Sequence, residues 1–111
     1  MKRIFALAAL SLFSVNLAIA AEVTPVMDKG CEPPKYPKAS LMNEETGSVV
    51  VGLLISADGK VVDTRVDKSS GFKSLDRAAT TGFSACKFKP GTKDGKVEQI
   101  WTKVQFDWSL S

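Results

Sequence analysis

The strongest constraint in this sequence is an alternation of apolar and polar residues that runs from Val97 to Leu110. In a β-strand every second side chain projects from the same face, so a period of two predicts a strand with one buried face. The residues expected to face the core are Ile100, Thr102, Val104, Phe106, Trp108 and Leu110. Those expected to face away from it are Trp101, Lys103, Gln105 and Asp107. Such a strand has to belong to a sheet that is covered on one side.

Two further strands are predicted on either side of a tight turn at Asp58-Gly59. Glycine adopts the positive φ that this kind of hairpin turn requires. The strand before the turn, Ser48 to Ala57, is apolar on both faces, which is typical of a central strand. The strand after the turn runs from Val61 to Lys68. If the first strand is central and pairs with its hairpin partner, the final strand takes its other side and forms an open edge.

Two helices are predicted to cover this sheet. A short one spans Tyr36 to Met42, with Pro37 tolerated in its first turn. Ser74 is expected to cap the second helix, and Gly82 within it is expected to let the sheet approach closely. One face of this second helix is apolar at helical spacing, through Leu75, Ala79, Phe83 and Cys86. The sequence therefore predicts a two-layer α+β fold, a three-stranded antiparallel sheet with two helices on one face.

The N-terminal residues have the pattern of a secretory leader. Lys2 and Arg3 precede an apolar run from Ile4 to Val15, and small residues at Ala18-Ile19-Ala20 provide a cleavage site. We therefore expect a signal peptide over residues 1–20 that is cleaved after Ala20, an extended arm over 21–35 and a domain over 36–111. The alternative is an uncleaved membrane anchor, although the run is shorter than the ~20 apolar residues that a spanning helix needs. After cleavage no stable membrane anchor is expected.

The charge of the chain gives little support for a nucleic-acid partner. The sequence contains 15 Lys and Arg against 12 Asp and Glu, but Lys2 and Arg3 leave with the leader, so 13 against 12 remain. A net charge so close to zero is not typical of proteins that bind the phosphate backbone. One cluster of lysines is either a solvated surface or a docking patch for an acidic partner: Lys87, Lys89, Lys93 and Lys96.

Cys31 and Cys86 are the two cysteines of the chain. An even number of cysteines in an exported domain favours a disulfide bond, because export leads to an oxidising compartment. Two buried free thiols are the alternative. A metal site is not expected, since the chain has no His and two thiolates alone are a poor ligand set.

No arrangement of residues indicates an enzyme. The chain has no His, which removes the most common general base. Ser69 and Ser70 lack the strand-turn-helix context of a hydrolase nucleophile, and no glycine-rich loop is suited to bind phosphate. We expect no catalytic residue, no cofactor and no small-molecule substrate. The chemistry that remains is hydrogen bonding by backbone N–H and C=O groups along the edge strand.

An ordered series of short motifs extends over about residues 34 to 110. It comprises Tyr36-Pro37, Gly47-Ser48-Val49-Val50-Val51, Asp58-Gly59-Lys60-Val61, Ser69-Ser70-Gly71, Leu75-Asp76-Arg77-Ala78-Ala79, Phe88-Lys89-Pro90 and Val104-Gln105-Phe106. In this order and spacing the series resembles the C-terminal domain of the TonB family of periplasmic energy transducers. The resemblance implies a periplasmic, non-enzymatic domain that captures an extended segment of outer-membrane receptors, the TonB box, by β-strand addition.

On this sequence the resemblance places the binding edge between Val97 and Phe106. The side chains expected to flank a bound segment are Glu98, Gln99, Ile100, Trp101, Thr102 and Lys103. Trp101 is also expected to form an apolar patch with Val50 and Leu54 on the sheet face opposite the helices. This patch either contacts a partner or is covered by the arm.

Three functions remain open at this point. The leading hypothesis is a stand-alone periplasmic module that binds an envelope protein, such as a TonB-dependent outer-membrane receptor, and assists transmembrane transport. The second is an energy transducer of the TonB type with a retained N-terminal anchor. The third is a small structural or inhibitory protein, stapled by a disulfide, whose own arm closes the edge of the sheet. The sequence determines neither the identity of the partner nor the oligomeric state.

Overall fold

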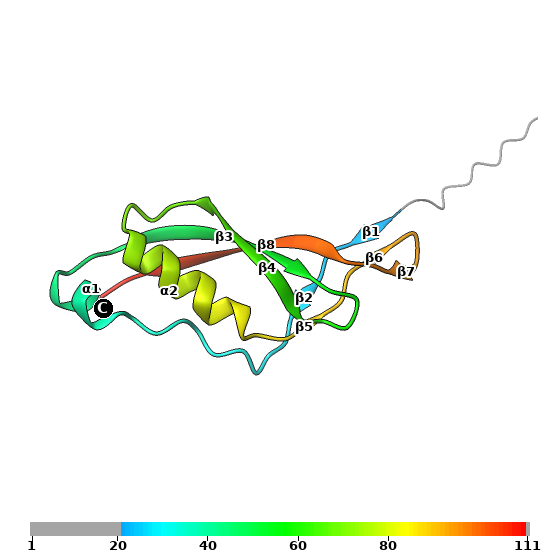
Figure 1. Cartoon of the computed structure of the whole chain (residues 1–111), viewed down its shortest axis with the longest axis horizontal. Helices are drawn as coiled ribbons and strands as arrows, with labels where there is room; N and C mark the ends of the chain where they lie inside the picture. The colour runs from blue at the N-terminus through cyan, green and yellow to red at the C-terminus, as the bar shows by residue number, and fades with distance from the viewer. Residues whose placement is uncertain (1–20, 111) are drawn as a thin grey trace, which may run out of the picture.

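The computed structural model of the protein describes residues 21–110, and the predicted signal peptide with its cleavage site after Ala20 lies outside the described residues. The described part is an α+β domain that combines two helices with a three-stranded antiparallel sheet, which is the predicted fold class (Figure 1). Two smaller sheets of two-residue strands extend the domain at the end where the described chain begins. Neither helix within residues 21–110 is long and apolar enough to span a membrane.

The main sheet has the predicted strand order, with the first long strand in its centre. Strand β3 (Gly47–Ile55) pairs with β4 (Val61–Lys68) on one side and with β8 (Ile100–Trp108) on the other. The side chains of β3 that face the helices are completely buried, namely Val49, Val51, Leu53 and Ile55. The predicted hairpin turn between β3 and β4 is also present, with Gly59 at φ +87°. The carbonyl oxygen of Phe88 lies against Gly59 where a Cβ would stand, so this position requires glycine for two reasons.

Helix α2 (Lys73–Ser84) packs against β3 and β4. Its predicted apolar face is confirmed, because Leu75, Ala79 and Phe83, together with Cys86 just beyond the helix, are all buried. The predicted cap at Ser74 is wrong. The helix begins at Lys73 after Phe72, which makes no side-chain capping bond.

The Ser74 hydroxyl bonds to other parts of the fold instead. It lies 2.7 Å from the hydroxyl of Ser40 in α1 (Lys38–Met42) and donates a hydrogen bond to the Glu45 carboxylate at 3.1 Å. Ser40 is completely buried, so this contact fixes the short helix α1 beside the start of α2. Ser74 therefore links the two helices and does not cap α2.

Asp76 organises the loop that leads from β4 into α2. Its carboxylate accepts hydrogen bonds from the Ser69 hydroxyl, from the Ser70 hydroxyl at 2.7 Å and from the Ser70 backbone N–H at 2.8 Å. Burial by itself raises the pKa of Asp76, but these hydrogen bonds stabilise the carboxylate and bring its pKa below the ordinary value. The Ser69-Ser70-Gly71 motif is therefore a structural loop built around one buried acid.

The arm over residues 21–35 contains two short strands that pair with the segment after α2. Strand β1 (Glu22–Val23) pairs with β6 (Thr92–Lys93), and β2 (Val26–Met27) pairs with β5 (Phe88–Lys89). Strand β7 (Lys96–Val97) lies on the other side of β6 and completes the small sheet. None of these pairings involves β8.

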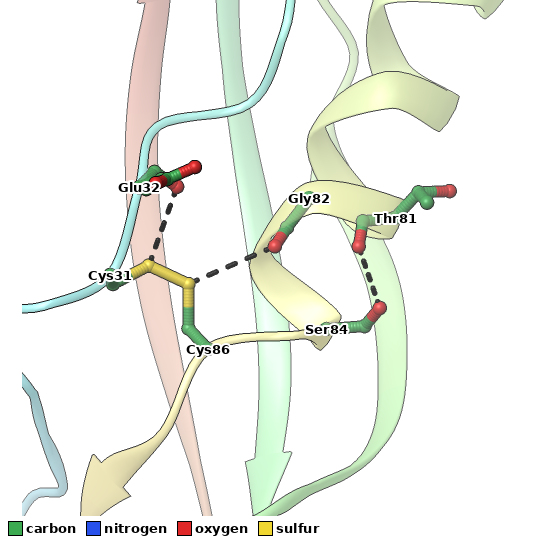
Figure 2. The surroundings of a disulfide bond; sticks show 6 residues. All are labelled: Cys31, Glu32, Thr81, Gly82, Ser84 and Cys86. Carbon is green, nitrogen blue, oxygen red and sulfur yellow. Dashed lines mark hydrogen bonds between the residues drawn. A yellow bond between two sulfur atoms is a disulfide. The ribbon is translucent and has the colours of Figure 1, made fainter.

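The rest of the arm runs along α2 and is joined to it by a disulfide. Figure 2 shows this bond between Cys31 in the arm and Cys86 just after the helix, whose Cα atoms lie 5.2 Å apart. Pro34 packs on Gly82, where an added Cβ would lie 2.9 Å from the Pro34 Cβ. The close approach predicted at Gly82 therefore exists, but its partner is the arm and not the sheet.

The predicted strand from Val97 to Leu110 is wrong at both ends. Val97 belongs to β7, because a turn at Asp94-Gly95 directs it back to pair with Thr92. Glu98 and Gln99 lie between strands, and the Glu98 N–H donates a hydrogen bond to the Gly91 carbonyl at 3.1 Å. At the other end Trp108 pairs with Gly47, the first residue of β3. Leu110 therefore lies beyond the end of the central strand. It is 45% exposed and does not belong to the core.

Candidate functional site: the outer edge of strand β8

Strand β8 has one hydrogen-bonded neighbour within residues 21–110. It pairs with β3 along its whole length, from Ile100 opposite Ile55 to Trp108 opposite Gly47, without any shift in register. The backbone N–H and C=O groups that point away from β3 have no strand beside them in the described part of the chain. A regular edge of this kind is suited to pair with an extended peptide.

The opposite edge of the sheet is less regular. Strand β4 pairs with β3 through two register shifts, one between Val50 and Val51 and one between Leu54 and Ile55. Bulges of this kind bend a strand and interrupt the repeat of its hydrogen-bonding groups, which protects an edge from further pairing. Of the two edges of the main sheet, β8 therefore offers the better template for an added strand.

The helix side of β8 is only partly covered by the fold. Ile100 and Trp108 at its ends are buried, whereas Thr102, Val104 and Phe106 between them are half-buried. The reason is that α2 packs against β3 and β4, so the middle of β8 lies beside the helix layer. The side chains of an added strand would therefore meet partly exposed apolar surface on this face.

Aromatic contacts hold the C-terminal end of β8 in place. The Phe106 ring packs edge-on against Phe83 of α2 and Trp108, with ring centroids 5.8 Å and 4.8 Å apart. Trp108 in turn packs edge-on against Tyr36, whose ring centroid is 4.9 Å away. Such aromatic pairs stabilise their arrangement beyond the area that they bury. The edge strand is therefore fixed to the core even though one of its sides is open.

The face of the sheet opposite the helices carries a connected set of side chains. The Arg65 guanidinium of β4 lies 4.1 Å from the centroid of the Trp101 ring on β8. Its Nε donates to the Asp67 carboxylate at 2.9 Å, and the Lys103 ammonium lies 3.8 Å from the other oxygen of that carboxylate. We call these four residues the open-face network: Arg65, Asp67, Trp101 and Lys103.

The predicted apolar patch on this face is present only in part. Trp101 stands directly opposite Leu54 on β3, but Val50 stands opposite Gln105, at some distance along the strands. The arm pairs with β5 and β6 and runs along α2, so it does not provide the cover that the sequence left open as an alternative. The open-face network is the feature that sequence reasoning missed, since no pattern in the sequence indicates that Arg65 contacts Trp101.

Asp107 ends the row of outward side chains on β8. The Ser48 hydroxyl donates a hydrogen bond to its carboxylate at 2.6 Å, and the Gln105 amide donates another at 3.2 Å. These bonds favour the charged form and lower the pKa of Asp107 from its ordinary value. The open face beside β8 therefore runs from an aromatic ring at Trp101, past the cation of Lys103, to a carboxylate at Asp107.

The residues predicted to flank a bound segment fall into two groups. Ile100, Trp101, Thr102 and Lys103 are the first residues of β8 and lie on the open edge. Glu98 and Gln99 lie in the connection before it, and the Glu98 N–H is already bonded to Gly91. A role for any of them in contacting a partner stays a prediction.

A separate groove of about 980 Å³ lies between the arm and α2. Its lining includes apolar surface from the disulfide and from prolines of the arm, together with charged residues of both signs: Asp28, Glu32, Lys35, Arg77 and Lys87. These mixed charges do not favour a ligand of either sign. Within residues 21–110 no group of three or more His, Cys, Asp or Glu is placed to hold a metal ion.

The TonB C-terminal family matches most of this chain. The family described as "Gram-negative bacterial TonB protein C-terminal" matches residues 32–110. Protein TonB of Xanthomonas campestris is 31% identical over 86 residues, which cover 78% of this chain and 39% of that protein. Protein tonB2 of Pseudomonas aeruginosa is 31% identical over 78 residues, which cover 70% of this chain and 29% of that protein. The chain therefore matches well under half the length of these relatives.

Solved structures agree with the sequence match. The solution structure of the Pseudomonas aeruginosa TonB C-terminal domain covers 78% of this chain with a TM-score of 0.61, and at 24% identity this likeness concerns the fold alone. A Helicobacter pylori TonB C-terminal domain is 32% identical, with 70% of each chain covered and a TM-score of 0.58. The family match over residues 32–110 and the relative that is 31% identical over 78% of this chain show that the chain belongs to the TonB C-terminal domain family.

Proposed function

We propose that this chain is a periplasmic protein-binding module that recognises an extended segment of an envelope protein by adding it as a strand to β8. The observation that carries the proposal is the outer edge of β8, which is paired in unbroken register with β3 and has no strand on its other side within the described residues. Membership of the TonB C-terminal family supports a link to transport across the outer membrane. An outer-membrane receptor with a TonB box is therefore the partner class that we favour.

Backbone pairing explains how such a module binds without a reactive side chain. Each hydrogen bond in an added strand contributes about 0.5–1.5 kcal/mol net, so several in a row give a useful affinity. Thr102, Val104 and Phe106 offer partly exposed apolar surface on one side of the added strand. The open-face network lies on the other side. The two faces together would let the module distinguish among extended segments.

A proline scan of adjacent residues in β8 tests this proposal. Neighbouring residues in an antiparallel edge strand point their N–H groups alternately toward the sheet and away from it. One of the two variants Lys103→Pro and Val104→Pro therefore removes a bond to β3, and the other removes only an outward donor. Val62→Pro, in the bulged part of the opposite edge, is the matched control.

The probes are synthetic peptides with the TonB-box segments of outer-membrane receptors, titrated against the folded domain. We expect the variant that loses the outward donor to remain folded and to bind these peptides several-fold more weakly, while Val62→Pro binds as the wild type does. Equal peptide binding by the wild type and by both folded β8 variants would show that β8 is not the acceptor edge. Intact-mass measurement of the protein isolated from the periplasm tests the accompanying proposal that residues 1–20 are removed.

A further inference from the structure

The open-face network depends on a glycine in the central strand. Gly52 lies between Arg65 on β4 and Lys103 on β8 in the sheet register. A Cβ at Gly52 would lie 2.9 Å from the Arg65 Nε and 3.1 Å from a carboxylate oxygen of Asp67. The missing side chain at Gly52 is therefore the space in which Arg65 crosses the sheet to reach Trp101.

Two contacts fix the guanidinium of Arg65 after it has crossed. The Trp101 ring lies 4.1 Å from it, and the Asp67 carboxylate accepts its Nε–H at 2.9 Å. The Asp67 side chain is 20% exposed, compared with 49% for Arg65, so the acid is the more buried partner of the pair. A cation over an aromatic ring at such a partly exposed site contributes about 0.5–1 kcal/mol. Arg65 therefore limits the positions that the Trp101 ring can adopt.

Trp101 belongs to the edge strand β8, so a residue of an added strand would be its direct cross-strand neighbour. Leu54 already stands opposite Trp101 on the inner side, within β3. A strand paired to the outer side of β8 places one of its own residues opposite Trp101, with Cβ atoms about 4.5–5.5 Å apart. That residue projects onto the open face beside Trp101, within reach of its aromatic side chain.

We propose that Trp101, held in place by Arg65, selects an apolar side chain at one position of the bound segment. The proposal rests on the proposed strand addition at β8. Trp101 is the contacting residue, and Arg65 is a positioning residue that acts through it. A β-branched or aromatic residue opposite Trp101 gains a favourable cross-strand pair, whereas a small polar residue leaves the ring in contact with water.

The probes for this inference are blocked peptides of alternating threonine and valine, and a set in which one valine at a time is replaced by serine. Titration is followed by NMR, with the amides of β8 reporting binding to the edge and the Trp101 indole N–H reporting contact with the ring. For the wild type we expect one valine whose replacement weakens binding about two- to fivefold. In Trp101→Ala the ratio of the affinities for the valine and serine peptides, which measures this discrimination, should fall to about one. Gln105→Ala, on the same face of β8, is the control and should keep it.

Variants of the network test the positioning role separately. Arg65→Met removes the cation but retains a long side chain, and Gly52→Ala displaces Arg65 by occupying its space. Both should shift the Trp101 indole signal and reduce the discrimination at the same valine, while the β8 amides still respond to the peptide. Arg65→Lys should retain part of the discrimination, because an ammonium also interacts with an aromatic face.

The outcomes separate this inference from the proposal on which it rests. If the peptides shift the β8 amides but no valine position depends on Trp101, the selective role is refuted and strand addition survives. If the dependence on Trp101 persists unchanged in both Arg65→Met and Gly52→Ala, Arg65 has no positioning role. If no peptide shifts any β8 amide of the wild type, strand addition and the selective role fail together.

Discussion

The disulfide between Cys31 and Cys86 is expected to provide a large part of the stability of this small domain. The two cysteines are 55 residues apart in sequence, so the bond closes a long loop in the unfolded chain. In the chain-entropy description, a loop of this length reduces the entropy of the unfolded state by an amount worth about 4 kcal/mol at 25 °C. Small domains have total stabilities of about 5–15 kcal/mol. Removing the bond should therefore bring the domain close to the limit of folding.

The perturbation is the double variant Cys31→Ala/Cys86→Ala, compared with the oxidised wild type by urea unfolding. We expect the free energy of unfolding to fall by about 3–4 kcal/mol, somewhat less than the entropic value, because the unfolded chain is not a perfect random coil. The wild type unfolded in a reducing buffer is the control, since it loses the covalent bond and keeps both sulfur atoms. Similar losses in the two samples attribute the effect to the cross-link and not to the packing of the buried Cys86.

A loss of less than about 1 kcal/mol in both samples would contradict this reasoning. It would mean that the cross-link restricts the unfolded chain much less than the chain-entropy description requires. Without the bond, the arm depends on the pairings of β1 and β2. Because these pairings involve two residues each, we expect them to open once the disulfide is removed. Faster amide exchange at Val26 and Met27 in the double variant would report this opening directly.

Two further predictions concern the loops. Asp76→Asn should lower the free energy of unfolding by about 1–3 kcal/mol at pH 7, because the buried acid accepts three hydrogen bonds from Ser69 and Ser70. The pKa of Asp76 is lower in the folded than in the unfolded protein. The contribution of Asp76 to the free energy of unfolding is therefore complete above the ordinary pKa of 3.8 and is lost as the pH falls below it. A difference in stability between wild type and variant that stays constant in acid would argue against this. Gly59→Ala should cost more than about 1 kcal/mol, because φ is +87° and the Phe88 carbonyl blocks the Cβ. Gly30→Ala, with no atom within 4 Å of its Cβ, should be nearly neutral in the same urea experiment, and equal costs at the two glycines would refute the steric argument.

Local patterns in the sequence predicted the main sheet and α2 because each depends on interactions between near neighbours. The alternation in β3 and β8 and the Asp58-Gly59 turn determine which residues face the core, and the completely buried valines of β3 confirm that face. The strand order followed from the apolar character of both faces of β3, since a strand of this kind has to be central. The open edge at β8 was a consequence of that order.

The features that sequence reasoning missed depend on contacts between distant residues. Val97 begins the alternation that predicts β8, yet the turn at Asp94-Gly95 pairs it with Thr92 in a separate hairpin. Hydrophobic periodicity does not distinguish between these two pairings. Ser74 is of a residue type that commonly caps helices, but its hydroxyl forms a hydrogen bond with Ser40 of another helix instead. Arg65 reaches Trp101 across a full strand because Gly52 has no side chain, which only the cross-strand register discloses. A glycine inside a central strand was the one available signal, since it often marks close approach of another group.

Hydrogen exchange along β8 reports directly whether the outer edge of this strand is open. In the free monomeric domain we expect the amides from Ile100 to Trp108 to alternate between slow exchange, where the N–H bonds to β3, and fast exchange, where it points outward. Addition of a TonB-box peptide should slow the fast set and leave the slow set unchanged. Slow exchange of every β8 amide in the free monomer would show that another part of the chain already occupies this edge, and it would contradict binding by strand addition to β8.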